Sequence, residues 1–161
     1  PTADMYKNGV AADFFHAQRK DPNIKQELHI RTLANQEIIR KAVFDVVYVD
    51  ENQMVREGSR TNVFFVHKTS LVTASSESVL CGIARENTIQ IAHEMGIDVQ
   101  QRNIALSEIA QFDAAFFTGT SPKILPIAVL GNYTFAPQNM LVQQCIDAYN
   151  QKLENYIQTY I

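Results

Sequence analysis

The sequence predicts an α+β fold with a single domain. Strand-like and helix-like segments mix along the chain without the regular strand–helix–strand alternation that marks a parallel α/β sheet. The chain has 161 residues, of which 46% are hydrophobic, and this is enough to bury one sizeable core. We therefore expect residues 1–161 to fold around one core.

The first half of the chain predicts one long helix among several strands. Apolar residues near helical spacing, with charges between them, predict a helix over residues 26–42. An Asn8-Gly9 turn precedes the first strand, and a polar turn at residues 50–53 follows the helix and the next strand. Runs of β-branched and aromatic residues predict the strands 10–15, 44–49, 61–67 and 70–73.

The second half predicts three helices and further strands. Gly96 ends a helix over residues 83–95, and Ser107 is expected to cap a short helix that ends near Gln111. The Gly131-Asn132 pair indicates a hairpin. Strands are expected at 97–99, 114–118, 127–130 and 133–135. The last helix, residues 138–160, carries an apolar stripe of Leu141, Cys145, Tyr149, Leu153, Tyr156 and Tyr160.

Composition argues against several classes of protein. The net charge is -3 and the basic residues are scattered, so we expect no nucleic-acid partner. No apolar run approaches the roughly 20 residues of a membrane span. Cys81 and Cys145 lie far apart among apolar neighbours, and we expect buried free thiols in a reducing, cytoplasmic compartment. The four histidines lack paired metal-ligand spacing, so no metal site is expected.

The segment 57–62 carries a carboxylate, Glu57, next to a tight glycine turn that leads into an aromatic strand. A carboxylate fixed by rigid backbone suits contact with one ring atom of a ligand. A second segment, Gly82-Ile83-Ala84-Arg85, opens a helix, and the first amides of a helix form an anion site.

A third segment, residues 118–121, follows a predicted strand. Gly119 allows the backbone to come close to a ligand, and Thr120 offers a hydroxyl. Read alone, each of the three segments is also typical of an ordinary turn or helix start.

The order and spacing of these segments resemble the C-terminal domain of the class IV, fold-type IV aminotransferases. These are pyridoxal-phosphate (PLP) enzymes and include the branched-chain and D-amino-acid aminotransferases and aminodeoxychorismate lyase. The resemblance runs from about Tyr6 to the final helix. It implies the D-amino-acid aminotransferase-like fold, with a mixed or barrel-like sheet flanked by helices, and a homodimer. It also implies that residues 1–161 are the C-terminal cofactor-binding domain, without the family's smaller N-terminal domain.

The resemblance assigns the catalytic lysine to Lys25, which would hold the cofactor aldehyde and move protons. Lys7, Lys20 and Lys41 are nearby alternatives. Arg31 stands in a similar local context, and a chain with arginine in that role would be inactive. The residues after Lys25 depart from the small, polar pattern of the family.

The other cofactor-binding residues implied are Glu57 at the pyridine nitrogen and Ile83, Ala84, Gly119 and Thr120 at the phosphate. The family usually has Thr where this chain has Ala84, so one hydroxyl contact is lost. Arg85 is expected to form only a surface or interface ion pair.

The implied reaction is amino-group transfer between an amino acid and a 2-oxo acid, with PLP as cofactor. Two alternatives stay open. One is a lyase of the aminodeoxychorismate type, which uses the same residues for elimination. The other is a non-catalytic domain that binds PLP or a partner, which applies if the chain is complete as given.

Overall fold

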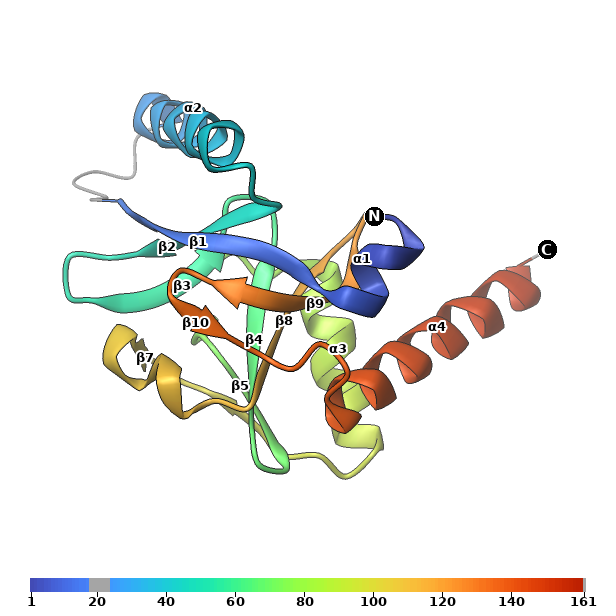
Figure 1. Cartoon of the computed structure of the whole chain (residues 1–161). Coiled ribbons are helices and arrows are strands. Elements are labelled where there is room, and N and C mark those ends of the chain that lie inside the picture. The colour runs from blue at the N-terminus through green and yellow to red at the C-terminus, as the bar shows by residue number, and fades with distance from the viewer. Residues whose placement is uncertain (18–23, 161) are drawn as a thin grey trace.

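The structure is a computed structural model that describes residues 1–17 and 24–160, without the side chains of residues 24–27. One curled sheet with flanking helices makes up the described part (Figure 1). The helices are α1 (Ala3–Asn8), α2 (Ile24–Lys41), α3 (Ile83–Glu94) and α4 (Met140–Tyr160), with a 3-10 helix η1 (Leu106–Gln111). The strands are β1 (Val10–His16), β2 (Asp45–Val49), β3 (Met54–Gly58), β4 (Asn62–His67), β5 (Ser70–Thr73), β6 (Val99–Gln101), β7 (Ile104–Ala105), β8 (Ala114–Gly119), β9 (Lys123–Leu130) and β10 (Tyr133–Thr134).

The sheet is mixed. Among the described residues its order is β6-β5-β4-β8-β9-β1-β2-β3-β7, and β10 pairs with β9. Strand β1 is parallel to both of its neighbours, whereas β8 is antiparallel to both β4 and β9. The α+β class and the mixed sheet flanked by helices are therefore confirmed.

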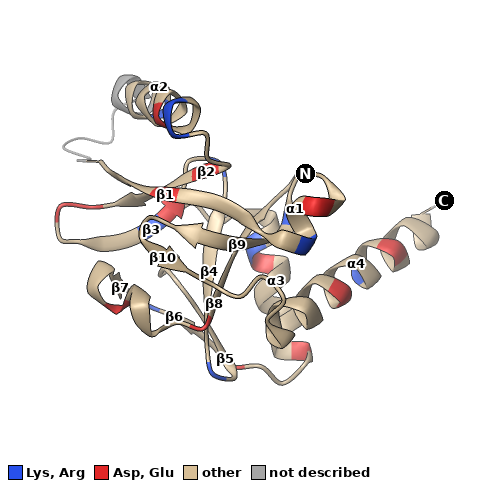
Figure 2. Cartoon of the chain, in the orientation of Figure 1, with Lys and Arg blue, Asp and Glu red and all other residues tan. Residues whose placement is uncertain are grey.

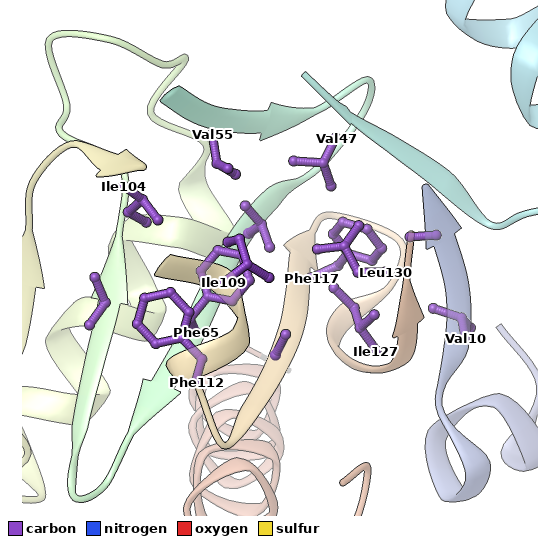
Figure 3. Packing of buried hydrophobic residues seen from close by; sticks show 14 of the residues in the cluster. Val10, Val47, Val55, Phe65, Ile104, Ile109, Phe112, Phe117, Ile127 and Leu130 are labelled. Carbon is purple, nitrogen blue, oxygen red and sulfur yellow. The ribbon is translucent and has the colours of Figure 1, made fainter. Parts of the chain in front are cut away.

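The concave side of the sheet encloses the larger of two hydrophobic clusters (Figure 3). Strands β1, β2, β4, β8 and β9 all contribute to it, so the sheet must curl for these side chains to meet. Phe65 stacks on Phe112 of the segment after η1, with ring centroids 4.8 Å apart. The cluster includes Val10, Val47, Val55, Phe65, Ile104, Ile109, Phe112, Phe117, Ile127 and Leu130.

The convex side packs against α3 and α4. Successive residues of a strand point to opposite faces, so Phe64 and Phe116 lie on this side while Phe65 and Phe117 face the concave core. The rings of Phe64 and Phe116 are stacked at 5.2 Å. The α3 helix thus has a fixed position against β4 and β8, and this places its first turn beside the ends of both strands.

Several sequence expectations need correction. Strand β3 was not predicted, because Arg56 and Glu57 within it resemble a polar turn. Helix α1 and the two-residue strand β7 were also missed. Ser107 lies inside η1, and the carboxylate of Glu108 instead accepts the Ala105 amide at 3.0 Å.

The apolar stripe of α4 is buried only in its first half. Cys145 and Tyr149 are buried, whereas Tyr156 and Tyr160 are exposed because the helix extends past the sheet (Figure 1). The expectation for Cys81 was also wrong, since its thiol is exposed while that of Cys145 is buried.

Charged residues of both signs are scattered along the helices, strands and loops (Figure 2). Within residues 1–17 and 24–160, no helix combines the length and the apolar character needed to cross a membrane. The same described residues contain no group of three or more potential metal ligands.

The two cysteines are expected to differ in reactivity. Burial raises the pKa of the Cys145 thiol to about 11, and the thiolate is the reactive form. Iodoacetamide at about pH 8 should therefore alkylate Cys81 alone in the native protein, and both cysteines after unfolding in urea. Mass spectrometry of the peptides checks this, and native labelling of Cys145 at the rate of Cys81 would contradict the described packing of α4.

Candidate functional site

A cavity of about 700 Å³ lies where the β3–β4 turn, the start of α3 and the β8–β9 turn meet. Its volume falls within the range of about 300–1,000 Å³ typical of small-molecule sites. Five of the six predicted cofactor-binding residues line this one cavity, although they are spread over more than sixty positions of the chain. They are Glu57, Ile83, Ala84, Gly119 and Thr120.

Glu57 is held at the edge of the cavity by groups from two segments. Its Oε2 atom accepts the backbone amide of Leu80 at 3.0 Å and lies 3.5 Å from Nδ2 of Asn62. The same Asn62 amide donates to the Leu80 carbonyl at 2.8 Å. Asn62 therefore ties the β3–β4 turn to the loop before α3, with Glu57 between them.

The first turn of α3 presents backbone donors to the cavity. Gly82 is the N-cap and provides no side-chain cap, and the first amides of a helix have no intrahelical acceptor. A Cβ at Gly82 would lie 2.8 Å from Oδ1 of Asn62, so glycine allows this close approach. The amides of Ile83 and Ala84 and the helix dipole together favour a bound anion.

The β8–β9 turn is braced from α1. A Cβ at Gly119 would lie 2.9 Å from Cγ of Pro122, which leaves no room for a larger residue. The Tyr6 hydroxyl donates to the Pro122 carbonyl at 2.7 Å, and burial raises the pKa of this phenol. Tyr6 stays protonated and keeps the turn, with Thr120, at the rim of the cavity.

Thr118 opens the 118–121 segment that the sequence marked, but the sequence assigned no role to its side chain. It pairs with Asn62 across the β4–β8 ladder and lines the cavity. Its hydroxyl is buried and has no hydrogen-bond partner among the described residues. Buried polar groups are nearly always paired, so an orphaned hydroxyl at a cavity indicates a ligand atom that would accept from it. The sequence signal for this residue is its place at the end of an apolar strand, directly before Gly119 and Thr120.

Lys25 belongs to α2, but its side chain lies outside the described residues. The part of α2 that follows it borders the cavity through Leu28, Ile30 and Arg31. The Arg31 side chain is exposed. The helix predicted to carry the lysine is therefore a wall of the same cavity that holds Glu57.

Arg85 is not the surface residue that the sequence suggested. Its side chain is fully buried, and Nη2 donates to the Ala74 carbonyl and to Oε1 of Gln101, both at 3.0 Å. It also pairs with Glu86. Arg85 thus fastens the segment before α3 to the sheet and to β6.

Comparison with known proteins identifies the family. Residues 2–130 match the model of the class IV aminotransferases, so the chain belongs to this family. The branched-chain-amino-acid aminotransferase of Pseudomonas aeruginosa is 33% identical over 95 residues, which are 59% of this chain and 31% of that protein.

Solved structures agree with this assignment. The branched-chain aminotransferase of Thermoproteus uzoniensis with norvaline superposes with a TM-score of 0.80 and 27% identity, covering 89% of this chain and 51% of that one. The PLP form of the Thermobaculum terrenum branched-chain amino acid aminotransferase gives a TM-score of 0.75 and 26% identity, covering 88% and 50%. The chain thus spans about half the length of these structures.

Class IV aminotransferases are PLP-dependent, and the cavity has groups that fit PLP. Glu57 supplies a carboxylate for a protonated ring nitrogen, and the start of α3 supplies donors for a phosphate. The orphaned hydroxyl of Thr118 lacks an acceptor, which a phosphate oxygen would provide.

Thr118→Val is expected to weaken PLP binding without weakening the fold. Removing an unpaired buried hydroxyl should leave folding unchanged or stabilise it by up to about 1 kcal/mol, while PLP affinity falls. Urea unfolding and a PLP absorbance titration measure the two effects.

Thr73→Val is the matched control, because the Thr73 hydroxyl is equally buried but donates to the Val63 carbonyl at 2.7 Å. It should cost about 1 kcal/mol of stability and leave PLP affinity unchanged. A loss of stability for Thr118→Val equal to that of Thr73→Val would show that its hydroxyl has a protein partner.

Proposed function

We propose that this chain supplies the cofactor-binding half of a PLP-dependent enzyme that transfers amino groups between an amino acid and a 2-oxo acid. The observation that carries the proposal is the convergence of Glu57, the amide-rich start of α3 and the β8–β9 turn on one cavity. Membership of the class IV family supports it.

Glu57 would hold a proton on the pyridine nitrogen. Two groups already fix its Oε2 atom, so the carboxylate keeps its orientation when the cofactor binds. PLP, when bound, acts as an electron sink for the substrate carbon that loses a proton. A carboxylate at the ring nitrogen strengthens that sink because it keeps the ring cationic.

The phosphate would lie at the first turn of α3. The amides of Ile83 and Ala84 would donate to it, with Gly119 and Thr120 closing the other side. The Thr118 hydroxyl would donate as well, and this offsets the hydroxyl that the family usually carries where this chain has Ala84.

Lys25 is proposed as the catalytic lysine. Its amine would hold the cofactor aldehyde until the substrate displaces it. It would then accept the proton from the substrate Cα and return it to the neighbouring cofactor carbon. Its place in α2, which borders the cavity, supports this role.

The cavity walls favour a substrate with an apolar side chain and a carboxylate. Leu28, Ile30 and Val79 provide apolar surface, while Arg31 and Arg60 also line the cavity and attract carboxylates. The related proteins are branched-chain aminotransferases. We therefore propose a branched-chain amino acid and its 2-oxo acid as the first substrates to test, with both enantiomers of the amino acid.

We further propose that the active form is a homodimer. Leu28, Leu80 and Ile83 are 59%, 79% and 80% exposed around the cavity, and this apolar rim would be covered by a second subunit or by a further domain. Both cysteines are free thiols, which supports a reducing, cytoplasmic location.

Borohydride reduction tests the assignment of Lys25. The reagent converts the carbon–nitrogen double bond between the cofactor aldehyde and a lysine into a stable amine, and peptide mapping then locates that lysine. We expect modification at Lys25 alone, loss of that modification in Lys25→Ala, and no change in Lys41→Ala, whose amine pairs with Asp13 at 2.6 Å. A single specific adduct that persists in Lys25→Ala would overturn the assignment.

A further inference from the structure

We propose that Asp45 is a positioning residue whose buried carboxylate fixes the β3–β4 turn and thereby sets the orientation of Glu57. The proposal that the carboxylate organises the turn stands on geometry alone. The consequence for the cofactor rests on the proposed function.

The Asp45 carboxylate is the centre around which the turn is folded. The residue is the first of β2 and is 0% exposed. Its Oδ1 atom accepts the Ser59 hydroxyl and, at 3.1 Å, the Ser59 amide, which it shares with the Val46 carbonyl at 3.0 Å. Its Oδ2 atom accepts the Thr61 hydroxyl at 2.8 Å and faces the Arg60 amide at 3.4 Å. Three successive residues of one turn therefore direct four donors at a single side chain.

Asp45 forms no ion pair within the described residues, although it is completely buried. Its Oδ1 atom also accepts the amide of the next residue, Val46, at 2.8 Å. A buried carboxylate without a cation is costly unless several donors satisfy it. The donors that do so belong almost entirely to residues 59–61, so the charge and the turn conformation depend on each other.

The turn has no spare room around this carboxylate. A Cβ at Gly58 would lie 2.6 Å from Oδ2 of Asp45 and 2.1 Å from Oγ1 of Thr61. The Gly58 amide donates to the Thr61 carbonyl at 2.9 Å and closes the turn. Glu57 directly precedes this closed loop and Asn62 directly follows it. The loop that Asp45 holds therefore fixes the positions of both Glu57 and Asn62, which contact each other.

Asp45→Asn is a minimal test of this arrangement. Asparagine keeps the shape, but its NH₂ group must occupy one of the two oxygen positions. Each position accepts a backbone amide, from Ser59 or from Arg60, so one N–H donor would face another. We expect the turn to loosen, and Glu57 to lose its fixed orientation.

The first measurement is amide hydrogen exchange in the chain without cofactor. The amides of Ser59 and Arg60 should exchange faster in Asp45→Asn, while the core amide of Phe65 stays protected. Unchanged exchange at Ser59 and Arg60 would overturn the proposal, whatever the protein's function. This measurement does not depend on PLP binding, so it separates a failure of the inference from a failure of the proposed function.

The second measurement is a double-mutant cycle on the PLP dissociation constant, read by absorbance titration. If Asp45 acts through Glu57, Asp45→Asn should weaken PLP binding roughly 10-fold in the native sequence and hardly at all in Glu57→Gln. Equal weakening in both backgrounds would show a general structural role and overturn the positioning role. If the native sequence binds no PLP at all, the proposed function fails and the exchange experiment decides on Asp45.

Asp50→Asn is the matched control. Asp50 is also a turn carboxylate on the β2–β3 hairpin, and it accepts the amides of Asn52 and Met54 and the guanidinium of Arg56. We expect Asp50→Asn to lower the free energy of unfolding, as Asp45→Asn does. Its PLP affinity and the slow amide exchange of the β3–β4 turn should stay unchanged.

Thr61 provides a milder pair of variants if Asp45→Asn does not fold. Thr61→Val removes one donor to Asp45, and Thr61→Ser keeps it. We expect faster exchange of the Arg60 amide in Thr61→Val and near-native exchange in Thr61→Ser. Identical behaviour of the two variants would contradict the role given to the Asp45 carboxylate.

Discussion

The hydrogen bond from the Leu80 amide to the Glu57 carboxylate is the contact on which the candidate site depends, because it joins two separate segments of the chain. PLP is a rigid ring with its phosphate at a fixed distance from its nitrogen. A protein that binds both ends must therefore fix the distance between the partner of the nitrogen and the phosphate donors. Here Glu57 lies on the sheet, and the donors begin with α3 at Ile83, three residues beyond Leu80. The hydrogen bonds that Leu80 and Asn62 make to Glu57 hold this carboxylate at a fixed distance from the start of α3.

The segment before α3 needs a second anchor, since it leaves β5 and crosses the end of the sheet before the helix begins. Arg85 provides that anchor from inside the helix, through the Ala74 carbonyl and Gln101. Burying a guanidinium is unfavourable unless acceptors surround it. Nη2 donates to the Ala74 carbonyl and to Gln101, and Nη1 pairs with Glu86, while the buried Nε has no partner among the described residues. Because Ala74 belongs to the segment that has to be held, desolvation of the charge and ordering of that segment are coupled.

Sequence reasoning located the site because glycine and charge mark it locally. The glycines at 58, 82 and 119 each stand where a Cβ would collide with a neighbour, and such positions are visible in a sequence as turns. The role of Asp45 and the unpaired hydroxyl of Thr118 were not visible in the same way, although Thr118 lies in the marked segment 118–121. Both are polar residues at the ends of apolar strands, and whether such a residue is satisfied depends on partners far away in the chain. Strand β3 was hidden for a related reason: its polar side chains have tertiary partners, which local patterns do not reveal.

If Ala84 stands where the family usually has threonine, as the resemblance implies, the proposed phosphate site has to manage without that hydroxyl. Backbone amides bind an anion whatever the side chain, so the α3 donors survive the substitution. The lost hydroxyl needs a replacement only if the phosphate has an unmatched oxygen, and Thr118 offers a buried hydroxyl from the facing strand. The donor would then come from strand β8 of the sheet in place of α3. A site built this way relies on β4 and β8 staying paired, and the stacked Phe64 and Phe116 rings on that ladder stabilise the pairing.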